Sequence, residues 1–323
     1  MFPGAPEPWL DLSTGINPHP YPFSPPPASA FTRLPENAQM DAVLEAAAAY
    51  YGAPSARNIV AAPGTQIMLP HVAGLVAGGD AAILSPTYAE HRRAASLAGH
   101  AVRDVRRFEE LHHANYAVVV NPNNPDGRVC SRRDLLELAG ELGRRGGLLL
   151  VDEAFMDVGP RQESLVGDTG SPGLVVLRSF GKFFGLAGVR LGFAIGAEDA
   201  IARLKSILGP WAVPGPTLAI ATEALRDSRW QTDMRNRLNG DSTRLDELLG
   251  EAGVGVVGGT SLFRLARHSG AAAVYEALGR EGILVRKFDF DSEVLRVGLP
   301  GDDRGYDRLE MALARWRHSE GAK

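Results

Sequence analysis

The sequence has little that ties it to an extracellular or membrane environment. It contains one cysteine, Cys130, so no intramolecular disulfide can form and nothing indicates an oxidising compartment. No apolar run approaches the roughly 20 residues of a membrane-spanning helix. Met1 begins a proline-rich segment without the basic and apolar regions of a secretory signal. These absences predict a cytoplasmic protein without a membrane partner.

Charge of one sign is also scarce, because 34 Lys and Arg residues stand against 38 Asp and Glu residues, a net charge of −4. Such a chain has no basic surplus to attract phosphate backbones, so we expect no nucleic-acid partner. The sequence also lacks histidines at metal-ligand spacing, a Walker pattern and a G-x-S-x-G elbow. It therefore predicts neither a metal site nor these two common types of catalytic site.

One glycine pattern is misleading. Gly253, Gly255 and Gly258 match the dinucleotide-binding pattern G-x-G-x-x-G. The pattern follows a helical stretch instead of a strand, and residues 259–263 have the composition of a turn that enters a strand. Because a dinucleotide site needs a strand before the glycines and a helix after them, we expect no nucleotide here.

The chain does contain an alternation of helical stretches and short apolar runs. Residues 36–51 favour a helix that ends at Gly52, and residues 131–145 and 229–252 favour two more. The short apolar runs are typical of strands buried on both faces of a parallel sheet. They are residues 58–62, 81–84, 117–120, 148–151, 174–177 and 193–195.

Three parts are expected along the chain. Residues 1–35 are rich in proline and predict an extended arm that docks on the body or on a partner subunit. Residues 36–210 predict a large α/β domain with a mostly parallel sheet. Residues 211–323 predict a smaller α+β domain, with strand-like pieces at 261–266 and 294–299.

Polar segments follow five of the apolar runs. Since the carboxyl ends of parallel strands share one edge of the sheet, where α/β proteins bind ligands, these segments predict a single site. They are residues 63–66, 85–88, 121–125, 152–153 and 178–182.

The segment 178–192, RSFGKFFGLAGVRLG, carries the most chemistry. Lys182 lies among small and aromatic residues, which desolvate an amine and make its neutral form available for Schiff-base formation. Ser179 and Arg190 supply a hydroxyl and a planar cation, both suited to a phosphate dianion. The glycines of the segment let the backbone turn closely around a ligand.

In order and spacing, these segments resemble the motifs of the fold type I pyridoxal-phosphate enzymes, the superfamily of aspartate aminotransferase. Segment 178–192 resembles the Schiff-base lysine motif, 121–125 (NPNNP) the N-P-x-N-P signature, and 151–154 (VDEA) the V-D-E-A strand end. The resemblance runs from about residue 10 to residue 300. It implies a fold type I structure with pyridoxal 5′-phosphate as cofactor.

The resemblance also implies roles for individual residues. Lys182 would bind the cofactor aldehyde, Asp152 would pair with the ring nitrogen, and Tyr88 would stack on the ring. Asn124 would donate a hydrogen bond to the ring 3′-oxygen. The cofactor phosphate would be held by the backbone of Gly64, Thr65 and Gln66 and by the side chains of Ser179 and Arg190.

Further residues are assigned to the substrate and to a second subunit. Arg296, in the sequence LRVGLP, resembles the arginine that binds the substrate carboxylate, and Asn17 would help it. Tyr51 matches a tyrosine that reaches the cofactor phosphate of a neighbouring subunit, which implies a homodimer. A substrate phosphate would need a further cation, for which Arg286 or Lys287 is preferred over His19.

Two groups within the superfamily are close in pattern, the histidinol-phosphate aminotransferases and the threonine-phosphate decarboxylases of cobalamin biosynthesis. Residues 178–182 (RSFGK) and 86–91 (PTYAEH) resemble the decarboxylases. Asp126 stands where aminotransferases usually have threonine, and Phe155 stands where they typically have tyrosine.

These features imply loss of CO2 from L-threonine O-3-phosphate, with histidinol-phosphate aminotransferase as the alternative. A more remote alternative is a regulator that kept the fold and lost catalysis. Such regulators usually carry a DNA-binding module, for which this chain has no spare segment.

Overall fold

Six strands of the main sheet run in one direction. In residues 2–321, the part of the chain that the computed structural model describes, this sheet has seven strands in the order β2-β8-β7-β6-β5-β3-β4. Within that sheet, β8 alone runs in the opposite direction to the other strands. The strands are β2 (Ile59–Ala62), β3 (Asp80–Leu84), β4 (Ala101–Val105), β5 (Tyr116–Val120), β6 (Leu148–Asp152), β7 (Leu174–Ser179) and β8 (Gly192–Gly196). The mostly parallel sheet is confirmed.

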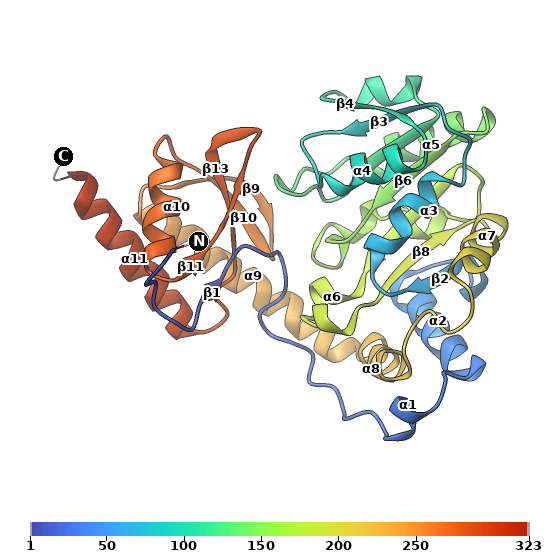
Figure 1. Cartoon of the computed structure of the whole chain (residues 1–323), viewed down its shortest axis with the longest axis horizontal. Coiled ribbons are helices and arrows are strands. Elements are labelled where there is room, and N and C mark those ends of the chain that lie inside the picture. Colours follow the sequence, from blue (N-terminus) through green and yellow to red (C-terminus); the bar gives the residue numbers. More distant parts are fainter. Residues whose placement is uncertain (1, 322–323) are drawn as a thin grey trace. The chain divides into compact units, whose positions relative to one another are not determined.

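The chain divides into two units (Figure 1). The large unit consists of Tyr21–Asn124 and Val129–Trp230 and contains the main sheet. The small unit consists of the chain up to Pro20, Pro125–Arg128 and the chain from Gln231 onward. The helices are α1 (Ser29–Thr32), α2 (Asn37–Tyr51), α3 (Leu69–Ala73), α4 (Glu90–Leu97), α5 (Arg132–Arg144), α6 (Phe180–Phe183), α7 (Glu198–Leu208), α8 (Gly215–Arg226), α9 (Ser228–Glu251), α10 (Ala271–Arg280) and α11 (Asp303–Gly321).

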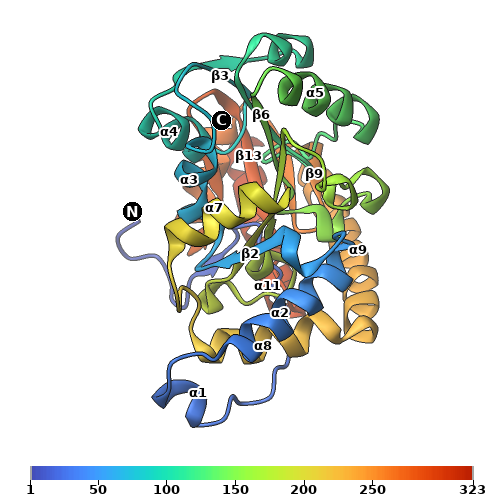
Figure 2. The same ribbon diagram turned by 90° about the vertical axis from the view of Figure 1, so that its right-hand side faces the viewer.

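The core of the large unit lies between the sheet and helices α3, α4 and α7. Leu148 and Leu150 of β6 face this core together with Val72 of α3 and Leu204 of α7. Side chains alternate along a strand, so the neighbouring residues of β6 point to the opposite face. Since all of β6 is buried, both faces of the sheet are covered, and helices lie on both sides (Figure 2).

Helix boundaries follow local chemistry. Helix α2 ends at Tyr51 because Gly52 adopts a left-handed conformation with φ of 79° and donates its amide to the carbonyl of Ala48. Helix α5 begins after Ser131, whose hydroxyl accepts the amide of Asp134. No helix of the described residues is both long and apolar enough to cross a membrane.

The small unit is built on an antiparallel sheet with the strand order β12-β13-β10-β9. Its strands are β9 (Gly255–Thr260), β10 (Phe263–Arg267), β12 (Arg286–Phe288) and β13 (Asp291–Gly298). Helices α10 and α11 pack against each other beside this sheet (Figure 1). The strand β9 contains most of the G-x-G-x-x-G pattern, so these glycines form one arm of a hairpin with β10.

The proline-rich N-terminal residues contribute to both units. Strand β1 (Leu10–Asp11) pairs in parallel with β11 (Ile283–Leu284) in the small unit. From Tyr21 to Asn124 the chain belongs to the large unit, where the ring of Tyr21 lies edge-on to Trp230 at 5.1 Å. Aromatic packing therefore helps to hold the chain at Tyr21.

Candidate functional site

The predicted cofactor residues all lie in the large unit, next to the carboxyl ends of its parallel strands. Asp152 is the last residue of β6, and Lys182 lies in the short helix α6 directly after β7. Asn124 follows β5, Tyr88 follows β3, and Gly64 follows β2. The prediction that these segments share one edge of the sheet is consistent with this topology.

Asp152 is a buried carboxylate held by two hydrogen bonds. Its Oδ1 accepts the backbone amide of Ala154 at 3.0 Å, and its Oδ2 lies 3.0 Å from Nε2 of His91. His91 is itself buried and lies in α4, three residues after Tyr88. Sequence reasoning assigned His91 no role. The only signal was its place at the end of the PTYAEH segment.

Tyr88 presents an exposed aromatic ring beside this pair. The side chain is 41% exposed, and its ring lies edge-on to the His91 ring with 5.9 Å between centroids. Its hydroxyl donates to Oε1 of Gln66 at 3.0 Å, while Nε2 of Gln66 donates to Glu90 at 2.7 Å. The ring is thus fixed at its hydroxyl end and remains accessible for stacking.

Lys182 is half-buried on a helix whose other side chains are anchored in the core. Phe180 and Phe183 are fully buried, and Lys182 Nζ lies 5.8 Å from the centroid of the Phe155 ring. At Gly181 a Cβ atom would come within 2.9 Å of Ala187 Cα, so this turn requires glycine. The aromatic surroundings reduce the hydration of the amine, as Schiff-base chemistry requires.

Donors for a phosphate gather where β2, β7 and β8 meet. Ser179 pairs with Gly192, and a Cβ atom at Gly192 would lie 2.5 Å from the amide nitrogen of Thr65. A Cβ atom at Gly64, whose φ is +85°, would lie 2.6 Å from Nη2 of Arg190. The guanidinium of Arg190 therefore rests on the Gly64 backbone. A hydroxyl, a guanidinium and backbone amides come together here, which is the donor set that a phosphate needs.

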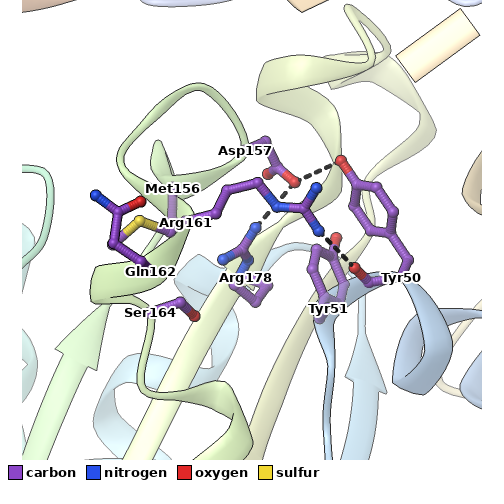
Figure 3. A pocket seen from close by; sticks show the side chains of 8 residues that line it. All are labelled: Tyr50, Tyr51, Met156, Asp157, Arg161, Gln162, Ser164 and Arg178. Carbon is purple, nitrogen blue, oxygen red and sulfur yellow. Dashed lines mark hydrogen bonds and ion pairs between the residues drawn. The ribbon is translucent and has the colours of Figure 1, made fainter. Parts of the chain in front are cut away.

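Tyr51 lines a cavity of about 340 Å³ (Figure 3). Its hydroxyl is buried without a hydrogen-bond partner among the described residues, and the guanidinium of Arg178 lies 4.4 Å above its ring. Burial, and to a lesser degree Asp157, raise the pKa of the Tyr51 hydroxyl well above its usual value. Arg178 forms ion pairs with Glu153 and Asp157, each at 2.9 Å.

The predicted substrate residues lie in the small unit. Arg286 of β12 and Arg296 of β13 are direct partners in the antiparallel register. Arg296 is buried and donates to the carbonyl of Ser13 at 2.6 Å. Burial, together with the charge of Arg286, lowers the pKa of Arg296 to about 10. Two neighbouring cations, one of them buried, form a place where an anion is stabilised.

The other candidates in the small unit have different surroundings. Asn17 is buried, and its side-chain oxygen accepts the amide of His19 at 2.8 Å. Nε2 of His19 lies 2.7 Å from a carboxylate oxygen of Asp241. Lys287 follows Arg286 on the strand and therefore points to the other face, where its Nζ lies 5.0 Å from the Tyr275 ring. Of the two preferred cations, Arg286 alone shares a face with Arg296.

A family model described as aminotransferase class I and II matches residues 27–313. The chain belongs to this family. A threonine-phosphate decarboxylase from Pseudomonas aeruginosa is 47% identical over 309 residues, which cover 94% of this chain and 91% of the relative. A threonine-phosphate decarboxylase from Sinorhizobium sp is 43% identical over 321 residues, which cover 97% of this chain and 94% of the relative.

The fold of this aminotransferase-family chain also matches solved structures. The histidinol-phosphate aminotransferase from Clostridium acetobutylicum aligns with a TM-score of 0.83 and 20% identity, covering 96% of this chain and 99% of that one. At this identity the likeness shows the fold alone, and the predicted type I fold is confirmed. The family depends on pyridoxal phosphate, so this chain is a pyridoxal-phosphate-dependent enzyme.

The residues present fit that cofactor. The buried carboxylate of Asp152 suits a protonated ring nitrogen, and the exposed face of Tyr88 suits a planar ring. The close approach of Arg190 to Gly64 suits a phosphate, because any larger residue at position 64 would fill the space. The primary amine of Lys182, beside the Phe155 ring, suits the cofactor aldehyde.

Proposed function

We propose that the protein decarboxylates L-threonine O-3-phosphate to (R)-1-amino-2-propanol O-2-phosphate in cobalamin biosynthesis. One observation carries this proposal: identity of 43–47% over nearly the whole chain to relatives named threonine-phosphate decarboxylase. The general features of the fold do not separate this reaction from transamination, since both kinds of enzyme share them. The residues around Lys182 are therefore needed to distinguish the two reactions.

Phe155 supports a decarboxylase over an aminotransferase. Its buried ring lies beside Lys182 Nζ. The aminotransferases that this sequence resembles typically have a tyrosine at this position. A phenylalanine cannot donate a hydrogen bond to the ring 3′-oxygen, so that donor is left to Asn124. This change would alter the electronics at the reacting centre.

The residues of the large unit have three proposed roles at the reacting centre. Asp152, oriented by His91 and Ala154, holds a proton on the ring nitrogen. Tyr88 stacks on the ring, and Lys182 Nζ anchors the cofactor and later delivers a proton to the substrate Cα. When bound, pyridoxal phosphate supplies the electron sink that accepts the electron pair left on Cα as CO2 departs.

Phosphate binding anchors the cofactor in this proposal. The backbone amides of Gly64, Thr65 and Gln66, with Ser179 and Arg190, hold the phosphate dianion. The close packing of these residues supports this role. A side chain at Gly64 would overlap Arg190, and a side chain at Gly192 would overlap Thr65. Asn124 donates its hydrogen bond to the ring 3′-oxygen from the loop after β5.

The small unit supplies the proposed substrate residues. Arg296 would bind the substrate carboxylate and fix its orientation, and Asn17 would assist. Arg286 binds the substrate phosphate. The direct pairing of Arg286 with Arg296 supports this division, because the substrate carries two anionic groups.

We further propose that the enzyme is a homodimer that acts in the cytoplasm, with neither nucleic acid nor membrane as partner. Tyr51 supports the dimer. A buried hydroxyl without a hydrogen-bond partner among the described residues costs free energy, and a phosphate in a neighbouring subunit would give it one.

The test is to supply the cofactor-loaded protein with L-threonine O-3-phosphate and no keto acid. Without an acceptor, transamination stops after one turnover, so steady release of CO2 and aminopropanol phosphate, which we expect, can come only from decarboxylation. Lys182→Ala should abolish that release, and a variant that keeps the wild-type rate would remove Lys182 from the mechanism. No CO2, but turnover of histidinol phosphate with 2-oxoglutarate, would overturn the decarboxylase in favour of the aminotransferase.

A further inference from the structure

Residues 121–130 form a loop that is closed at its base within the large unit. The side-chain amide of Asn121 donates to the carbonyl of Cys130 at 3.2 Å, and the amide of Cys130 donates back to Asn121 Oδ1 at 2.9 Å. Asn123 is fixed as well, since it donates to the carbonyl of Pro86 at 2.9 Å and accepts the hydroxyl of Thr87 at 2.7 Å. The loop therefore has little freedom up to Asn123.

The tip of the same loop, Pro125–Arg128, belongs to the small unit. The carbonyl of Asp126 accepts the amide of Gly259 in β9 at 2.9 Å. Oδ1 of Asp126 accepts the amide of Arg128 at 3.0 Å, which stiffens the turn. Because β9 is an edge strand of its sheet, its free side is available to hold the tip.

Glycine is required on both sides of this contact. A Cβ atom at Gly258 would overlap the carbonyl oxygen of Asp126, and a Cβ atom at Gly127 would overlap the backbone of Gly259. Gly127 also has a φ of +72°, which a side chain would strain. By contrast, a Cβ atom at Gly255 in the same strand would meet only the carbonyl of Arg267, at 3.8 Å. Of the glycines that match the nucleotide-binding pattern, Gly258 thus permits a backbone contact.

Asn124 lies between the two fixed parts of the loop. Asn123 before it is hydrogen-bonded in the large unit, and Pro125 after it is part of the tip held by β9. Any displacement of the tip must be taken up by backbone rotation at the residues that flank Pro125–Arg128, and Asn124 is one of these two residues.

We infer that Gly258 and Gly127 are positioning residues, which set the orientation of Asn124 by letting the loop tip seat on β9. The inference rests on the proposed function, in which Asn124 donates to the ring 3′-oxygen. A hydrogen bond donated to that oxygen favours its anionic form. The pH at which the visible absorbance of the bound cofactor changes therefore reports on Asn124.

The experiment titrates that absorbance in holoenzyme carrying Asn124→Ala, Gly258→Ala or Gly255→Ala. We expect Asn124→Ala to raise the midpoint by about one pH unit, since it removes the hydrogen bond outright. Gly258→Ala should raise the midpoint by about half as much. Gly255→Ala, the matched control in the same strand, should leave it at the wild-type value. Amide exchange without cofactor should show faster exchange at Gly259 in Gly258→Ala alone.

Each result has a separate meaning. A wild-type midpoint in folded Gly258→Ala, with a raised midpoint in Asn124→Ala, would overturn the positioning role and leave the proposed function standing. A wild-type midpoint in Asn124→Ala would instead overturn the placement of Asn124 in the proposed site, and the inference with it. If Gly258→Ala does not fold, Asp126→Ala takes its place, because it removes the bond that stiffens the tip. It should raise the midpoint in the same direction, and an unchanged midpoint would overturn the inference.

Discussion

His91 Nε2 lies 3.0 Å from Oδ2 of Asp152, and both side chains are buried. The amide of Ala154 holds the other carboxylate oxygen, so the plane of the carboxylate is fixed from two sides. A buried carboxylate that must face a ring nitrogen gains from such fixation, since it does not have to reorient during the reaction. His91 is therefore a positioning residue for the proposed catalytic Asp152.

Replacing His91 with asparagine should lower kcat about tenfold, because it removes one hydrogen bond to a charged group in the site. The KM for L-threonine O-3-phosphate should change less, since the proposed substrate residues are elsewhere in the chain. Steady-state CO2 release measures both quantities, and an absorbance titration measures the affinity for the cofactor, which should fall.

His100→Asn is the matched control for this variant. His100 is also buried, and its Nε2 lies 2.9 Å from the carbonyl of Ala73. Both variants lose a buried imidazole, so both should lose stability, but only His91→Asn should lose kcat. An equal loss of kcat in the two variants would mean that His91 acts only through stability.

The sequence was sufficient to predict the main sheet because its strands are continuous apolar runs followed by polar segments. It did not predict β4, whose Arg103 and Asp104 interrupt the apolar pattern of an edge strand. It did not predict β9, because glycine is unfavourable in strands and here serves a backbone contact. The reversal of β8 depends on pairing with distant strands, which no local pattern encodes.

In the candidate site, too, some residues could be predicted from the sequence and others could not. Residues in short motifs, such as Lys182 and Asp152, could be identified, since motif chemistry is local. The partners of Arg178 could not, because Asp157 and Glu153 contact it through the fold and carry no spacing signal. The sequence also could not predict that the loop passes from one unit to the other after Asn124, because this depends on tertiary contacts.

We expect the charge of Arg296 to lower the stability of the fold and to strengthen substrate binding. Burial and Arg286 lower its pKa to about 10, so the folded chain holds this proton less tightly than the unfolded chain. The charged side chain therefore costs stability at neutral pH, and this cost diminishes only as the pH rises above about 10. Arg296→Met should leave the free energy of unfolding unchanged or higher while raising KM roughly a hundredfold. Urea unfolding and steady-state kinetics measure the two effects.

Arg264→Met is the control for this trade-off. Arg264 lies in the adjacent strand β10 and forms an ion pair with Asp246 at 2.6 Å. Its replacement should lower stability and leave KM near the wild-type value. A large loss of stability in Arg296→Met would contradict the proposal that its charge is held for an anionic ligand.

Two exposed glycines should respond to alanine with opposite signs. Gly52 ends α2 with a φ of 79°, which alanine adopts at a cost, so Gly52→Ala should lower the free energy of unfolding by about 1 kcal/mol. Gly240 lies inside α9 with open space around it, so Gly240→Ala should raise that free energy by roughly 0.5–1 kcal/mol. Urea unfolding of both variants tests the assignment, and changes of the same sign would contradict it.

The ion pairs of Arg178 should be the strongest of the described polar contacts in the large unit. Arg178→Met leaves Glu153 and Asp157 buried without their cation, which should lower the free energy of unfolding by about 3–5 kcal/mol. Arg132→Met, which breaks a partly exposed pair with Asp168, should cost at most about 1 kcal/mol. Urea unfolding at pH 7 compares the two.

The pH dependence of Arg178→Met separates lost charge from lost packing. Burial already raises the pKa of Glu153, and removal of the cation raises it further. A folded state with the higher carboxyl pKa binds the proton more tightly, so the variant is most stable at low pH and loses stability as the pH rises. Its deficit relative to wild type should therefore grow between about pH 5 and pH 8. The double variant Arg178→Met with Glu153→Gln should recover part of that deficit. A deficit that depends neither on pH nor on Glu153 would mean that Arg178 acts through packing alone.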